Sequence, residues 1–428
     1  MNTPRILATL LVLAALCPRA LAGDVPVTWK GKKFTTDAIL VDLPPAQKKA
    51  VVLFADWAKK AGYRMDFDAQ SRVLLITPAE RSRLVDTQKI VAQAETWFDT
   101  VLPAPDRTAL AQTEPAKPEA PAKKPAPAPI PEDPESAPAG GGAAPKPAPA
   151  SAPLPPAVTR NWGSGSIEPD TQTAVMIIVK DEKEYAALLD SLGLNQPYLA
   201  TWLETARKQQ GFVLEDPLAG AYIENAAGQE EWSPDHELYN RVVQLMTLRR
   251  FGQQPNWLVQ GLAWDGEMAF DGGVYCFPYR KEFVFAAEHT AWPSEVKLLL
   301  KDNGGKAIEL SEITSWKRGT WDNRGAKLAW GLTHQMLAMA PGKLSLALED
   351  LRRVRDEKDR RATSSGQWER VPGYEIPVDV QIATLKKHFG ADVMKSATNG
   401  MRSGKDAKPA KSPKDKPDPG DKSGSRAR

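Results

Sequence analysis

The pattern of apolar and polar positions in the first hundred residues predicts alternating helices and strands. Apolar residues recur at helical spacing over residues 47–62, which predicts a helix that ends at a glycine. Two short apolar runs follow, at residues 63–67 and 72–76, and their length is typical of strands. A second helix is predicted over residues 79–102. This part of the chain therefore has an α/β pattern.

A similar alternation returns after residue 170. Residues 174–179 form an uninterrupted apolar run, which is typical of a strand buried on both faces. Helices are predicted over 182–192 and 199–210, and the runs 211–214 and 219–223 predict a hairpin. The remaining pattern is largely helical. The predicted fold class is α+β, with a small mixed sheet followed by a mainly helical region.

Composition divides the chain into segments. Residues 104–157 are rich in Pro, Ala, Lys and Glu, which predicts an extended, disordered linker. The linker separates an N-terminal α/β segment, residues 23–103, from a second region, residues 158–398. Residues 399–428 form a basic tail of Lys, Pro, Gly, Ser and Asp, which cannot bury enough apolar surface to fold.

Residues 1–22 have the features of a secretory signal. Arg5 precedes a short apolar stretch, and Ala20-Leu21-Ala22 fits the small-x-small cleavage rule. Export to the periplasm or beyond is therefore expected. Cys17 lies within this segment, but Leu16 before it is a poor context for lipidation. After cleavage, Cys276 is the only remaining cysteine, so no intrachain disulfide is expected.

Charge and hydropathy argue against some classes of partner and against a membrane-spanning segment. The chain has 428 residues, of which 42% are hydrophobic, so it can bury a substantial core. The net charge is only +3, and much of that excess lies in the tail, which argues against nucleic acid as the main partner. The apolar stretch of the signal is too short to span a membrane, and no other segment is apolar enough, so no integral membrane segment is predicted.

The candidate functional residues lie on three predicted helices. The first begins at Ser233, a typical N-cap residue followed by proline, and continues with His236-Glu237-Leu238-Tyr239-Asn240. The second contains Trp257-Leu258-Val259-Gln260-Gly261-Leu262-Ala263. The third, over residues 326–340, contains an Ala-Trp pair followed by His334.

These helices resemble those of the gluzincin-type zinc metallopeptidases, and in particular the bacterial peptidase MA-like group. There the first helix carries H-E-x-x-H, and the second has the pattern W-L-x-E-G-L-A. The resemblance implies a zincin-like fold whose edge strand binds the backbone of the substrate. It aligns His236, Asn240 and Gln260 with the three zinc ligands and Glu237 with the general base. It also implies that the linker interrupts one domain, so the helix around Val91 packs on the second region.

The exchanged ligands predict that zinc has been lost. Asn240 and Gln260 offer neutral amide oxygens in place of an imidazole and a carboxylate, and His236 alone would hold zinc poorly. Without the metal, Glu237 has no activated water to serve. The expected protein is therefore an exported, degenerate member with no cofactor. It would bind a peptide, protein or envelope polymer, or act as a scaffold in the cell envelope.

Two alternatives stay open. An active zinc peptidase could use an altered ligand set with Glu237 as base, and Glu267 could supply a carboxylate. Glu267, however, lies about 10 Å along the helix from Gln260. Alternatively, His236 and Glu237 are only a solvated helix entrance, and the tryptophans nearby are core residues and not an aromatic platform for a ligand. Of the other histidines, His289, His334 and His388, the second is expected to be a packed core residue.

Overall fold

The computed structural model covers the whole sequence and describes most of its predicted elements. The described residues are 27–29, 32–34, 45–67, 71–78, 81–105, 172–195, 200–215, 218–225, 233–276, 290–302, 306–314, 323–358, 360–362, 368–370 and 375–403. The expected signal, nearly all of the expected linker and most of the expected tail lie outside these ranges. His289 and the tryptophans at 316 and 321 lie outside them as well.

A mixed β-sheet forms one half of the molecule. Five of its strands follow the order β3-β4-β5-β7-β6. These strands are β3 (Arg64–Phe67), β4 (Val73–Thr77), β5 (Ala174–Val179), β6 (Gly211–Leu214) and β7 (Ala219–Ile223). Two short strands, β1 (Val27–Trp29) and β2 (Lys32–Phe34), extend the sheet beyond β3. The predicted hairpin is confirmed, since β6 pairs antiparallel with β7 and forms one edge of the sheet.

The sheet joins the segments on the two sides of the expected linker. Strand β4 pairs parallel with β5, with Val73 opposite Ala174 and Ile76 opposite Ile177. All residues of both strands are buried, which fits their uninterrupted apolar sequences. The residues before and after the linker therefore belong to one sheet and share its core.

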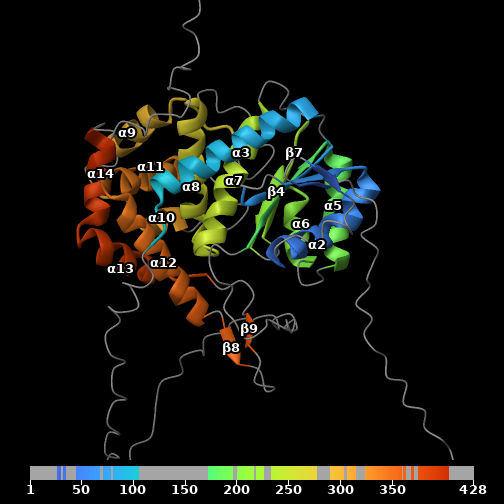
Figure 1. Ribbon diagram of the computed structural model, residues 1–428. Helices are drawn as coiled ribbons and strands as arrows, with labels where there is room; N and C mark the ends of the chain where they lie inside the picture. Colours follow the sequence, from blue (N-terminus) through green and yellow to red (C-terminus); the bar gives the residue numbers. More distant parts are fainter. Residues whose placement is uncertain are drawn as a thin grey trace, which may run out of the picture.

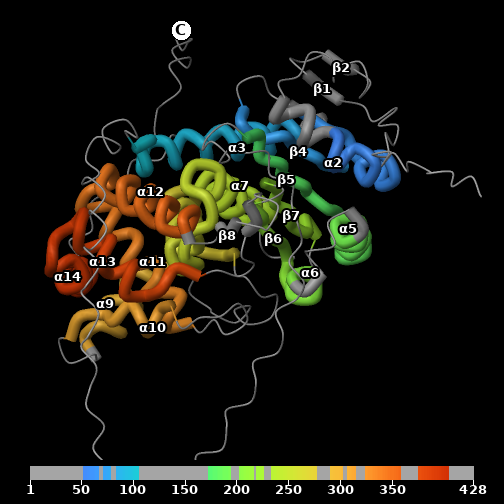
Figure 2. The backbone as a smooth tube through the Cα atoms, turned by 90° about the horizontal axis from the view of Figure 1, so that it is seen from below, coloured from blue at the N-terminus to red at the C-terminus, as the bar shows by residue number. Residues whose placement is uncertain are grey.

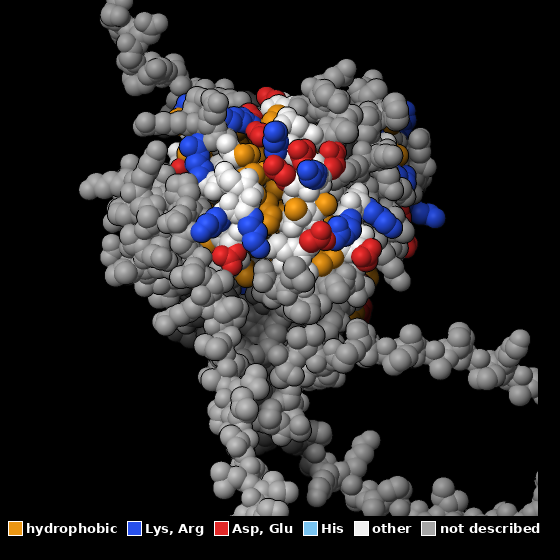
Figure 3. Space-filling model, turned by 90° about the vertical axis from the view of Figure 1, so that its right-hand side faces the viewer, with side chains coloured by type: hydrophobic (Ala, Val, Ile, Leu, Met, Phe, Trp, Pro, Cys, Tyr) orange, Lys and Arg blue, Asp and Glu red, His pale blue; other side chains and the backbone are white. Residues whose placement is uncertain are grey.

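Alternate residues of the strands feed two separate cores, because successive side chains in a strand point to opposite faces. Val175 and Ile177 face a core that contains Trp57 and Tyr185. This face is covered by α2 (Pro45–Ala61), α5 (Glu182–Asn195) and α6 (Ala200–Ala206), on the right of the molecule (Figure 1). Over the outer surface there, basic and acidic described side chains are interspersed and form no patch of one sign (Figure 3).

The opposite face of the sheet packs against α3 (Arg81–Val101) and α7 (Pro234–Phe251). The rings of Trp97 and Tyr239 lie 6.4 Å apart where these two helices meet. Arg250 donates to the backbone oxygen of Leu102 and to Asp99, which fixes the end of α3 on α7. The prediction that the helix around Val91 packs on the second region is confirmed.

The second half of the molecule is helical and continues the core beneath α7 (Figure 2). Its main element is α8 (Asn256–Asp271), which packs between α7 and α11 (Asn323–Met339). The remaining elements are α9 (Trp292–Asp302), α10 (Leu310–Thr314), α12 (Pro341–Lys358), β8 (Arg360–Ala362), β9 (Trp368–Arg370), α13 (Val378–Phe389) and α14 (Val393–Ser403). The α+β class, with a small mixed sheet and a helical region, is therefore confirmed.

One predicted helix is shorter than expected. Helix α6 ends at Ala206, four residues before the predicted end, because the backbone oxygen of Gln210 already accepts a hydrogen bond from Ile223 of β7. Trp257, Trp264, Trp292 and Trp330 are buried, as predicted for core residues. Within the described ranges, no helix combines the length and the apolar character needed to cross a membrane.

Candidate functional site

The entrance of α7 is capped as predicted, and the His-Glu pair that follows the cap is buried. Ser233 Oγ accepts a hydrogen bond from the backbone N–H of Asp235 at 3.3 Å, and Pro234 occupies the first helical position. His236 and Glu237 nevertheless keep only 4% and 6% of their surface exposed. The alternative of a solvated helix entrance is therefore wrong, because α7 is enclosed by the sheet, α3 and α8.

His236 lies between two carboxylates of α8. Its Nε2 is 3.2 Å from Asp271 Oδ2, and its Nδ1 is 3.8 Å from Glu267 Oε2. The ring also packs on Tyr275, with 4.1 Å between ring centres. Burial lowers the pKa of His236, but Glu267 and Asp271 together raise it more, so its pKa lies above the ordinary value of 6.5. Folding therefore favours the protonated form of His236 relative to an ordinary histidine.

Glu267 is fully buried, and both of its carboxylate oxygens accept hydrogen bonds. One of its oxygens accepts from the side-chain amide of Asn240. The other accepts from the backbone N–H groups of Tyr275, at 2.8 Å, and Cys276, at 3.2 Å. The carboxylate therefore ties the segment that follows α8 to the middle of α7. These donors also supply the hydrogen bonds that a buried charge requires.

Glu237 and Arg241 form a buried ion pair one turn apart on α7. Arg241 Nε donates to Glu237 Oε2 at 3.0 Å, and both side chains are more than nine-tenths buried. Burial raises the pKa of the Glu237 carboxyl, although Arg241 opposes this. The pKa of Arg241 is raised, since the attraction of Glu237 outweighs the effect of burial. The guanidinium is therefore charged.

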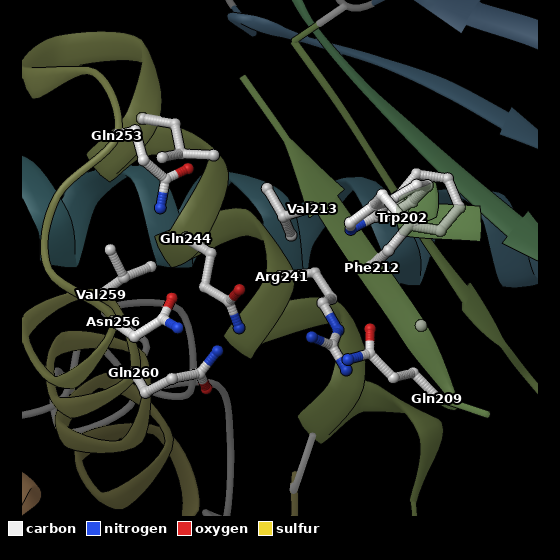
Figure 4. Close-up of a pocket in the computed structure, with 12 residues that line it drawn as sticks. Trp202, Gln209, Phe212, Val213, Arg241, Gln244, Gln253, Asn256, Val259 and Gln260 are labelled. Atoms are coloured by element: carbon white, nitrogen blue, oxygen red, sulfur yellow. The ribbon is translucent and has the colours of Figure 1, made fainter. Parts of the chain in front are cut away.

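A cleft opens beside Arg241, between the edge strand β6 and helices α7 and α8 (Figure 4). It encloses about 570 Å³, counting the part that is open to solvent. Polar and apolar side chains alternate on its walls, and the polar groups are amides and one guanidinium. The lining residues are Trp202, Gln209, Gly211, Phe212, Val213, Arg241, Gln244, Leu248, Gln253, Asn256, Val259 and Gln260.

The three expected ligand positions are divided between two places in the structure. His236 and Asn240 lie beside Glu267, whereas Gln260 lines the cleft with Gln244 and Arg241. Helix α8 runs past α7 so that Glu267, seven residues after Gln260 and about 10 Å further along the helix, is the residue opposite Asn240. Gln260 therefore does not complete a set with His236.

Gln244 lies one turn after Asn240 on α7 and lines the cleft, whereas Asn240 does not. Gln244 donates to the side-chain oxygen of Asn240, so these two residues form a contacting pair at i and i+4. Arg241 follows the first of them, as Glu follows His in H-E-x-x-H. Arg241 and Gln244 were missed from sequence. The spacing of Asn240, Arg241 and Gln244 before Gln260 was the signal that could have found them.

Zinc, which the resemblance implies, does not fit the residues present. In the cleft, the positively charged Arg241 repels a cation, and Gln244 and Gln260 provide only amides. Beside His236, the oxygens of Glu267 already accept three N–H groups. Across the described ranges, no three or more His, Cys, Asp or Glu side chains gather in a way that could hold a metal ion.

The other histidines have structural partners. His334 Nδ1 lies 2.6 Å from Asp265 Oδ1, and its ring stacks on Trp330 with 5.3 Å between centres. His388 Nε2 lies 2.7 Å from Asp350 on α12. Both histidines connect helices in the helical half of the molecule, and neither lines the cleft.

Comparisons with known proteins add no assignment to this geometry. No protein-family model matches the sequence, and a search of curated proteins gives no match.

Proposed function

We propose that this chain is an exported, degenerate relative of the peptidase MA-like proteins that binds an extended peptide without cleaving it. The observation that carries the proposal is the cleft between β6, α7 and α8, which Arg241, Gln244 and Gln260 line with one guanidinium and two amides. Export is part of the proposal because residues 1–22 have the sequence features of a secretory signal.

The edge strand supports peptide binding. Strand β6 pairs with β7 on one side, and no other described strand pairs with its outer side. Gly211, Phe212 and Val213 of this strand line the cleft. An extended chain that lies in the cleft can therefore add to the sheet through backbone hydrogen bonds, while its side chains enter the adjacent pocket.

The polar groups of the cleft support loss of the metal. A zinc peptidase needs imidazole or carboxylate ligands and a carboxylate base, and the cleft offers amides and a guanidinium. Glu237, the residue expected to act as base, forms the ion pair with Arg241 on α7. A catalytic role for Glu237 would require it to leave this partner, so the alternative of an active peptidase gains no support.

Reversion of the cleft tests the proposal. The variant N240H/R241E/Q244H/Q260E restores the H-E-x-x-H spacing and its third ligand around the cleft, so it should bind zinc close to stoichiometrically. The unchanged chain should contain far less than one zinc per molecule, measured by mass spectrometry of metals after purification without chelators. Tightly held zinc in the unchanged chain would overturn the proposal.

A matched control variant distinguishes two possible positions of the former zinc site along α7. The variant N240H/Q260E reconstructs the set with His236 that the sequence suggested, and it leaves Arg241 and Gln244 in place. It should not gain zinc, because Gln260 lies about 10 Å along α8 from the residue opposite Asn240. Zinc binding by this double variant, and none by the fourfold variant, would show that the cleft is not the position of the former site.

A further inference from the structure

The guanidinium of Arg241 is the most unusual group in the cleft. It is 4% exposed, and its hydrogen bond to Glu237 uses only Nε. Arginine has five N–H donors, so four remain on its two terminal nitrogens. Since Arg241 lines the cleft and has no further hydrogen bond within the described ranges, these donors are available to a ligand.

Three amide side chains surround the same space. Gln244 and Gln260 lie on the helical wall of the cleft, and Gln209 lies on the wall next to β6 (Figure 4). The side-chain amides of Gln209 and Gln260 have no hydrogen-bond partner in the described part of the chain, and Gln244 uses one N–H of its amide on Asn240. N–H donors therefore converge from both sides of the cleft.

Among the described residues that line the cleft, none is acidic and Arg241 is the one that carries a charge. Glu237 offsets part of its charge, but it reaches only the Nε side of the guanidinium. The two terminal nitrogens present parallel N–H groups, and their geometry matches the two oxygens of a carboxylate. A neutral carbonyl would satisfy only part of this set.

We propose that the cleft recognises a carboxylate of the bound peptide, held end-on by the terminal nitrogens of Arg241 and by the amides of Gln244 and Gln260. This inference rests on the proposed function and specifies its ligand. The peptide backbone would lie along β6, and its carboxylate would reach the guanidinium. The carboxylate comes either from the end of the peptide chain or from an Asp or Glu side chain.

Binding of three short peptides to the full chain tests the inference. The probes are acetyl-Ala-Ala-Ala with a free carboxylate, acetyl-Ala-Ala-Ala-amide, and acetyl-Ala-Asp-Ala-amide, titrated by calorimetry. At least one acidic probe should bind about tenfold more tightly than the neutral amide, because a charge-assisted, paired hydrogen bond is lost with the carboxylate. The acidic probe that binds more tightly identifies the source of the carboxylate.

Variants assign the preference to Arg241. The double variant E237Q/R241Q removes both charges of the ion pair together and should bind all three probes equally. Q260L leaves the ion pair intact and should reduce the preference for the acidic probe by about threefold. The control R324Q removes one positive charge from a partly exposed pair with Glu312 on α10, outside the cleft, and should keep the full preference.

The outcomes separate the two levels of the proposal. Equal binding of the acidic and neutral probes by the unchanged chain would overturn carboxylate recognition and leave peptide binding intact. An acidic preference that persists in both E237Q/R241Q and Q260L would place the carboxylate elsewhere. If no probe binds the unchanged chain at millimolar concentration, the peptide-binding function itself is refuted together with its ligand.

Discussion

Removing Arg241 alone should destabilise the protein far more than removing it together with Glu237. In R241M, the Glu237 carboxylate loses the partner that lies 3.0 Å from it, on a helix most of whose residues are buried. The carboxylate must then stay charged in an apolar environment or take up a proton. In E237L/R241M, by contrast, neither charge is left without a partner.

The structure gives the size of this effect. Two unit charges 3.0 Å apart attract each other by about 5 kcal/mol when the effective dielectric constant is about 20. Breaking a buried pair on one side typically costs about 3–5 kcal/mol, whereas replacing both partners by apolar residues is often close to neutral. R241M should therefore lose about 3–5 kcal/mol of the free energy of unfolding, and E237L/R241M about 1 kcal/mol or less.

Urea unfolding followed by tryptophan fluorescence measures these differences. The control R207M removes an arginine whose partner, Asp190, is 62% exposed, and it should change the free energy of unfolding by less than about 0.5 kcal/mol. If R241M loses no more than R207M, the guanidinium is not a buried partner of Glu237. If the double variant loses as much as R241M, the loss comes from packing and not from an unpaired charge.

Three further predictions concern other parts of the site. Because the pKa of His236 is raised by Glu267 and Asp271 against the effect of burial, its stabilising charge is present below about pH 6.5 and is lost as the pH rises through the folded pKa. H236Q should therefore lower the free energy of unfolding more at pH 5.5 than at pH 8.5. An equal loss at both pH values would show that protonated His236 does not stabilise the fold. G261A places a methyl group 2.9 Å from the backbone oxygen of residue 329 and should lower the free energy of unfolding by about 1–3 kcal/mol, whereas G342A meets no atom within 4 Å and should not destabilise. E267L leaves the N–H groups of residues 275 and 276 without their acceptor, so hydrogen exchange at both should accelerate, and unchanged rates would show that this carboxylate does not hold the segment.

Much of the fold follows from local sequence pattern. The continuous apolar run of β5 predicts a strand covered on both faces, and Ser233 with Pro234 predicts the start of α7. Both signals depend on residues close in sequence. Helical spacing likewise places Trp257 and Trp264 in the core. These elements were predictable because each residue's environment is set within one or two turns.

The grouping of the site was less predictable for a physical reason. Periodicity determines which residues share a face of α7 or α8, but not how far one helix is displaced along the other. That displacement places Glu267 beside Asn240 and Gln260 beside Gln244. It is determined by close contacts between these two helices, such as that of Gly266 of α8 with Tyr239 and Val243 of α7. The spacing of a motif along one chain does not contain this information.

The parallel pairing of β4 with β5 also constrains how the chain can fold and be divided. The paired residues are about 100 positions apart, and the entropy of closing such a loop grows only with the logarithm of its length, by about 0.6 kcal/mol for each doubling. Shortening the Pro- and Ala-rich segment by half should therefore hardly affect stability. Cutting the chain within that segment makes association of β4 and β5 depend on concentration. Two fragments expressed separately would each expose apolar residues that are buried in the intact chain, and they would recover the fold only by binding each other.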